Sequence, residues 1–220
     1  MSKLSWGADD ALKTYQNGVD RVVLFPKTTN GTYPAGVAWE GVTAVNEKAS
    51  GGESDKKYAD NRAYLNLMSP EEFNATIEAF SSPEEFDMCD GTAEIEPGLL
   101  VTAQNRSAFG LAYRVMVGNE ADGSAANYEI HLVYDAKAKP SARNNATVGD
   151  KVEPQSLSWD ITTKKEDVPG FQPSAHLIVR SSAYDSGKLA AIEALIYGSD
   201  SPDTPASLPT PAEVIAIVAA

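Results

Sequence analysis

The clearest hydrophobic pattern in the chain lies at residues 107–140, where two stretches alternate apolar and polar positions. The apolar side chains that should share a face are Phe109, Leu111, Tyr113, Val115 and Val117 in the first stretch and Tyr128, Ile130, Leu132, Tyr134 and Ala136 in the second. A period of two is typical of a half-buried β-strand. Between them, Gly118, Asn119, Asp122 and Gly123 tolerate the positive φ of a turn. The pattern predicts a two-stranded ribbon that packs its apolar face on a second layer.

The polar positions of the second stretch, among them Glu129, His131 and Asp135, should face away from that layer. His131 is therefore expected to be a surface or interface residue. Shorter extended segments are predicted at residues 18–25, 37–47, 58–68, 73–80, 155–163 and 175–181, with a helical turn near 82–91 and helices at 186–197 and after 210.

These elements predict a mainly β fold, an antiparallel β-sandwich or partly closed barrel with a flanking α-helix and a short C-terminal helix. Residues 1–17 lack a strand or helix period and are expected to be an N-terminal arm. Residues 18–198 should form one sandwich domain, and residues 199–220 a Pro-rich linker with a terminal helix. The charged, Gly-rich segment 48–57 is expected to be a mobile loop.

The composition excludes several classes of function. A formal net charge of −13 argues against nucleic-acid binding, which depends on Lys and Arg. No apolar run is long enough to cross a membrane and no signal peptide is visible, so a cytoplasmic product without membrane contact is expected. The single cysteine, Cys89, excludes an intrachain disulfide, and two histidines leave little for a zinc site. We expect no metal and no cofactor.

Catalytic motifs are also missing from the sequence: it has no nucleophile motif, phosphate-binding glycine loop or His/Glu metal pattern. Trp39 and Trp159 fall on apolar faces of expected strands, which favours core positions over sugar-stacking platforms. Cys89 is expected to be a small buried residue. An enzyme is disfavoured, and a soluble ligand- or carbohydrate-binding sandwich and a carboxylate-dependent hydrolase are kept as alternatives.

Several segments of the chain, taken in order, point to a known family. They are residues 39–43 (WEGVT), 51–54 (GGES), 58–61 (YADN), 76–80 (TIEAF) and 83–86 (PEEF), and most strongly 109–114 (FGLAYR), 117–119 (VGN) and 130–134 (IHLVY). Over roughly residues 18–182 the sequence resembles the major tail tube proteins of long, non-contractile-tailed bacteriophages of Gram-positive hosts.

This resemblance implies a β-sandwich with a flanking helix, whose copies form hexameric rings that stack into a hollow tail tube. DNA would pass through the bore without specific binding. The partners implied are other copies of the chain, a tape measure protein, a tail terminator and baseplate or initiator proteins. The implied location is the virion tail, assembled in the host cytoplasm.

Within that reading, the polar faces of the strands are expected to line the bore, through Glu40, Glu78, Glu129 and Asp135. The acidic charge would then keep DNA from adhering. The N-terminal arm, the 48–57 loop and the terminal helix have no core of their own, so we assign them to contacts between subunits or rings. The residues assigned to those contacts are Trp6, Glu53, Asp55, Val214, Ile215 and Ile217.

Overall fold

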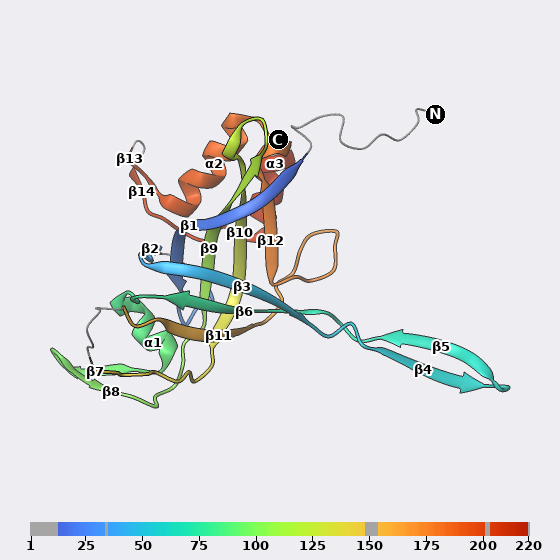
Figure 1. Ribbon diagram of the computed structural model, residues 1–220, viewed down its shortest axis with the longest axis horizontal. Coiled ribbons are helices and arrows are strands. Elements are labelled where there is room, and N and C mark those ends of the chain that lie inside the picture. Colours follow the sequence, from blue (N-terminus) through green and yellow to red (C-terminus); the bar gives the residue numbers. More distant parts are fainter. Residues whose placement is uncertain (1–12, 34, 148–153, 201–202, 220) are drawn as a thin grey trace.

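The computed structural model describes residues 13–33, 35–147, 154–200 and 203–219. The fold is mainly β, with antiparallel, sandwich-like sheets and a short C-terminal helix, as the sequence predicted. Figure 1 shows two crossing layers of strands, helices against the outer side of one layer, and a long hairpin that projects away from both.

The large sheet contains eight strands: β1 (Thr14–Pro26), β2 (Val37–Ala38), β3 (Val42–Ser50), β6 (Glu72–Ala79), β9 (Phe109–Asn119), β10 (Gly123–Ala138), β11 (Leu157–Thr163) and β12 (His176–Arg180). Three two-stranded hairpins stand apart from it: β4 (Ser54–Ala59) with β5 (Arg62–Met68), β7 (Ala93–Glu96) with β8 (Leu99–Val101), and β13 (Ser199–Asp200) with β14 (Asp203–Thr204). The helices are η2 (Glu84–Phe86), α1 (Asp87–Asp90), η3 (Ser181–Ala183), α2 (Ser186–Tyr197) and α3 (Pro211–Ala219).

Strand β10 joins the two layers. The strand order is β2-β1-β9-β10-β11-β6-β3, and β12 also pairs with β10. The middle of β10 pairs with β12, from Glu129 to Val133, and its end pairs with β11, from Ala136 to Ala138. A β-bulge at Asp135, whose φ is +46°, separates the two paired stretches. The bend lets one strand serve both layers of the sandwich.

Both faces of the β9–β10 ribbon are buried. One face meets β3, β6 and β11 in a core whose largest side chains are Trp39, Phe86, Phe109, Tyr113 and Trp159. The other face meets α2 and α3 through Ile130, Leu132, Tyr134, Ile192 and Ile196. The expectation that one ribbon face stays polar and open was therefore wrong. The helices cover the face that carries Ile130 and Leu132, while His131, on the other face of β10, packs beside Tyr113 between the two layers. The expected apolar positions of β9 and β10 thus lie on opposite faces of the ribbon.

Helix α2 begins and ends where the sequence predicted. The Asp185 carboxylate accepts hydrogen bonds from the backbone N–H groups of Gly187 and Lys188, at 2.9 and 3.0 Å. Gly198 follows the last turn with φ +79°. The capping box of α3 is also confirmed, since the backbone N–H of Thr210 donates to the Glu213 carboxylate at 2.8 Å.

Several boundaries differ from expectation. Strand β1 begins at Thr14, inside residues 1–17, which were expected to be an N-terminal arm. Residues 14–17 are a strand because they pair with β9. The 48–57 segment is not a free loop, since its residues end β3 and form β4. Residues 199–220 do not form a separate unit over their described part, because Leu208 and Val214 are buried in the core beneath α2. The β7–β8 hairpin was not predicted.

Candidate functional site

The β4–β5 hairpin, here called the arm, is the most exposed structured element of the chain. Figure 1 shows it reaching well beyond the sandwich as an extension of β3 and β6. Every residue of both strands is exposed. Within the described residues, β4 and β5 pair with each other and with no other strand. Each strand therefore presents one unpaired edge to solvent.

The local sequence explains why the arm forms. Asp60 and Asn61 both adopt positive φ, at +51° and +57°, which is the conformation of a two-residue type I′ hairpin turn. At the base, Gly51 has φ +84°, and a Cβ there would lie 2.2 Å from the carbonyl oxygen of Pro70. Glycine is thus required where the two strands leave the sandwich, and the arm continues the antiparallel pairing of β3 with β6.

Apolar side chains cover much of the arm. Its large exposed hydrophobic residues are Tyr58, Tyr64, Leu65, Leu67 and Met68. Leu65 and Leu67 are 47% and 50% exposed and, two residues apart on one strand, share a face. A second apolar group lies on and beside the β7–β8 hairpin, at Ile95, Leu99 and Leu100. Across the hairpin, Leu65 and Leu67 lie opposite Lys57 and Asp55, so the arm presents large apolar side chains next to charged ones. An element that exposes this many large apolar side chains is a candidate for binding another molecule.

The four carboxylates expected in a tube bore lie in different environments. Glu40 is exposed in the turn before β3. Glu78 is half-buried on β6 and accepts a hydrogen bond from Asn46 at 3.0 Å. Asp135 pairs with Lys27 at 3.0 Å. Glu129 is only 7% exposed, so the argument that placed it on an open polar face was wrong.

The residues assigned to subunit contacts also lie in different environments. Trp6 lies outside the described residues. Glu53 and Asp55 are exposed at the base of the arm, and Asp55 pairs with Lys57 at 2.7 Å. Val214 is 5% exposed and belongs to its own chain's core, contrary to expectation, because α3 docks beside α2.

Ile215 and Ile217 are half-buried on the same docked helix. Ile217 packs against the core that lies under α2, together with Val218. The terminal helix therefore finds its docking surface within its own chain.

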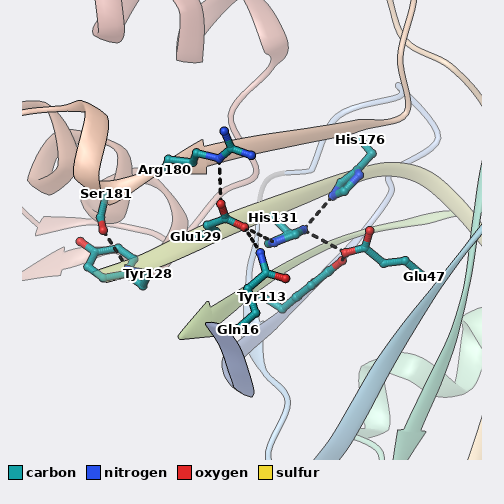
Figure 2. Close-up of polar contacts among 9 residues, drawn as sticks. All are labelled: Gln16, Glu47, Tyr113, Tyr128, Glu129, His131, His176, Arg180 and Ser181. Carbon is teal, nitrogen blue, oxygen red and sulfur yellow. Dashed lines mark hydrogen bonds and ion pairs between the residues drawn. The ribbon is translucent and has the colours of Figure 1, made fainter. Parts of the chain in front are cut away.

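A partly buried polar cluster joins the two layers, and Figure 2 shows its members pointing toward one another. Both histidines of the chain are in it, although 45 residues separate them. His131 Nδ1 lies 3.0 Å from His176 Nε2 and 3.1 Å from Glu47 Oε1. The Tyr113 hydroxyl donates to Glu47 Oε1 at 2.7 Å, and its ring stacks on His131. Glu47 comes from β3, His131 from β10 and His176 from β12.

The charges in the cluster are set by its surroundings. The hydrogen bond from His131, helped by the one from Tyr113, lowers the pKa of Glu47 to about 2 despite partial burial. Burial lowers the pKa of His176 to about 4. At neutral pH, Glu47 is therefore a carboxylate and His176 a neutral imidazole with one unprotonated ring nitrogen.

Glu129 closes the other side of the cluster. Its Oε1 accepts from Arg180 Nε at 2.8 Å, and its Oε2 accepts from Gln16 Nε2 at 2.6 Å. Oε2 also lies 3.9 Å from His131 Nε2. His131 Nε2 is buried and has no hydrogen-bond partner among the described residues. The histidine ring thus lies between two carboxylates.

The sequence interpretation missed this cluster. It expected His131 at the surface, but its side chain is only 5% exposed. One signal was available: Glu47 continues the face of β3 that carries Val45, and a carboxylate on an apolar face needs a buried partner. The distance in sequence between the two histidines gave no such signal.

Comparison of the sequence with models of known protein families finds no match, and comparison with curated proteins finds no significant relative. Across the part of the chain that the structure describes, no helix has both the length and the apolar character to span a membrane.

Proposed function

We propose that this chain is a structural subunit that assembles with copies of itself into stacked rings, forming the hollow tail tube of a bacteriophage. The proposal joins the sequence resemblance at residues 109–134 to one structural observation, the exposed apolar arm. In the proposal, rings are hexameric, DNA passes through the bore, and the assembled protein belongs to the virion.

The arm is the observation that carries the proposal. An isolated two-stranded hairpin is at best marginally stable in water, and this one also exposes large apolar side chains. A solitary soluble domain gains nothing from such an element. A subunit that lays its arm on a neighbour buries those side chains and covers the hairpin's edges.

Ring closure follows from the kind of contact. The arm of one subunit and the surface that receives it are different patches, so the contact is head-to-tail. Head-to-tail contacts close into a ring when the rotation between subunits divides a full turn. The two faces of such a ring differ, which allows rings to stack without limit.

The charge of the chain supports a bore through which DNA slides. Six copies with a formal net charge of −13 each would produce a strong negative field. Glu40 and Glu78 remain the candidates for lining the bore, because Glu129 and Asp135 are engaged with Arg180 and Lys27.

A carbohydrate-binding module is the weaker alternative. Its aromatic platform would have been Trp39 or Trp159, which are 3% and 1% exposed. Both rings pack against each other and Phe86 in the core. Neither ring is available to stack on a sugar.

Negative-stain electron microscopy of the concentrated protein tests the proposal. Rings or hollow tubes of uniform width are expected for the intact chain. A variant in which residues 53–69 are replaced by a short Gly-Gly turn should stay folded and monomeric. An intact chain that remains a monomer at high concentration, even when a tail initiator complex is supplied, contradicts the proposal.

A further inference from the structure

We infer that Glu47, His131 and His176 form a binding site for a divalent transition metal ion, which would tie the base of the arm to the centre of the sandwich. This inference does not rest on the proposed tube function. It rests on the geometry of the cluster, on the proton balance at His131 and on the strands that supply the three side chains.

The separations between ligand atoms fit a small metal ion. One nitrogen from each histidine and one carboxylate oxygen all lie within 4.8 Å of one another. His131 Nδ1 is 3.0 Å from His176 Nε2 and 3.1 Å from Glu47 Oε1. Ligands about 2.0–2.1 Å from a tetrahedral metal are separated by roughly 3.3 Å. Only small side-chain shifts would be needed to admit Zn²⁺.

The proton balance at His131 favours a cation between these groups. If Nε2 carries the ring proton, it points at the Glu129 carboxylate, 3.9 Å away, and the Nδ1 lone pair then lies against the Glu47 oxygen and can accept only from His176 Nε2. If Nδ1 carries the proton, it satisfies either Glu47 or His176, and Nε2 directs a buried lone pair at a carboxylate. A cation at Nδ1, either a metal ion or a second ring proton, relieves the repulsion between His131 and the two carboxylates.

The outer contacts match those of metal-binding histidines. Such a histidine usually donates its second ring N–H to a carboxylate, which fixes the orientation of the ring. Glu129 lies in that place and is itself held by Arg180 and Gln16. Tyr113 supports the ligand carboxylate of Glu47 through its hydroxyl. Glu47 is thus supported by a hydrogen bond from Tyr113, and His131 Nε2 faces the Glu129 carboxylate at 3.9 Å.

An ion can reach the site from solvent. The Glu47 side chain is 40% exposed. His176 lines an open surface pocket of about 390 Å³ together with Phe73 and Ser174. Two imidazoles and one carboxylate leave at least one coordination position free for water, and this donor set suits Zn²⁺ and related first-row ions.

The three proposed ligands come from strands in both layers of the sandwich, so a bound ion would connect the layers. Glu47 lies three residues before the end of β3, the strand that continues toward the arm. His131 lies in β10, and His176 begins β12. A bound ion would therefore clamp the edge strand of one layer to two strands of the other.

Isothermal titration of the untagged, chelator-treated chain with Zn²⁺ tests the inference, with Co²⁺ as a spectroscopic probe. We expect one ion per chain, visible absorption of low-coordinate Co²⁺ and a higher melting temperature. Glu47→Gln and His176→Gln should each weaken binding by at least about 100-fold, and Glu129→Gln by about 10- to 100-fold. Glu78→Gln, on the neighbouring strand β6, is the matched control and should bind as the intact chain does.

Circular dichroism establishes that each variant is folded, and Glu47→Gln is the safest because its side chain is partly exposed. Absence of saturable binding to the intact chain overturns the inference and leaves a proton as the occupant of the cluster. Binding that survives both Glu47→Gln and His176→Gln also overturns it. A chain that binds Zn²⁺ but never polymerises supports the metal site and contradicts only the tube proposal.

Discussion

Replacing Leu65 and Leu67 with serine should weaken assembly while leaving the subunit folded. Both leucines lie on β5, near the middle of the arm, and about half of each side chain is exposed in the single chain. They are absent from both buried cores. The substitution therefore removes apolar surface that only a second molecule can bury.

The size of the effect follows from the exposed fraction. Full burial of a leucine side chain contributes about 1.5–3 kcal/mol, so burying the remaining half contributes about 1 kcal/mol for each residue. The pair then loses about 2 kcal/mol per subunit contact. Since 1.4 kcal/mol corresponds to a factor of ten, the concentration needed for assembly should rise about 30-fold. By the same reckoning, the half of each side chain that the single chain already covers is also lost, so the free energy of unfolding of the single chain should fall by no more than about 2 kcal/mol and the chain stays folded.

Sedimentation of a concentration series measures the concentration needed for assembly, and urea unfolding of the dilute chain measures the free energy of unfolding of the single chain. Lys56→Ser, on the partner strand β4, is the matched control because it changes an exposed arm residue without removing a large apolar side chain. Assembly of the double variant at the same concentration as the intact chain would refute the reasoning that the arm drives association.

Three further predictions concern the single chain. Val214→Ala should lower the free energy of unfolding by about 2 kcal/mol, because its side chain is buried beneath α2; an unchanged urea midpoint would show that α3 is not part of the core. Cys89 should resist thiol reagents at pH 8 until the chain unfolds, because burial raises its pKa to about 12; rapid labelling of the native chain would contradict this. The hydrogen bonds from Arg114 hold the pKa of Asp20 in the folded chain below its usual 3.8. The ionised Asp20 therefore contributes its full stabilisation of the fold above pH 3.8, and this contribution is lost as the pH falls through the lowered pKa of the folded chain. Asp20→Asn should flatten that part of the pH profile of the melting temperature, and an unaltered profile would exclude the pair as its cause.

The sequence predicted the strands and helices well where one residue pattern decides the structure. The period-two runs marked β9 and β10, and the helix expected at 186–197 has the bounds of α2. It could not show that the second ribbon face is covered. Gly110 on that face looks neutral in sequence, yet a Cβ there would lie 2.3 Å from Leu208 Cδ2, so the small residue is what admits the C-terminal segment.

The two candidate sites, the arm and the polar cluster, were harder to predict from the sequence than the strands and helices. Half of the arm was predicted: the extended segment expected at 58–68 covers β5. Most of β4 was taken for a loop, because it lies in the charged, Gly-rich segment 48–57 and both faces of the hairpin are exposed, so no alternation marks it. The cluster of Glu47, His131 and His176 depends on how three strands are placed relative to one another. Such placement is set by packing across the whole sandwich, which no local pattern encodes.

The most direct test of the central claim is a cryo-electron microscopy map of the assembled protein. The account predicts six-fold rings stacked into a hollow tube, with the β4–β5 arm of each subunit lying on its neighbour and the side chains of Leu65 and Leu67 buried between them. A map in which the arm projects into solvent, or preparations that contain only single chains, would contradict it.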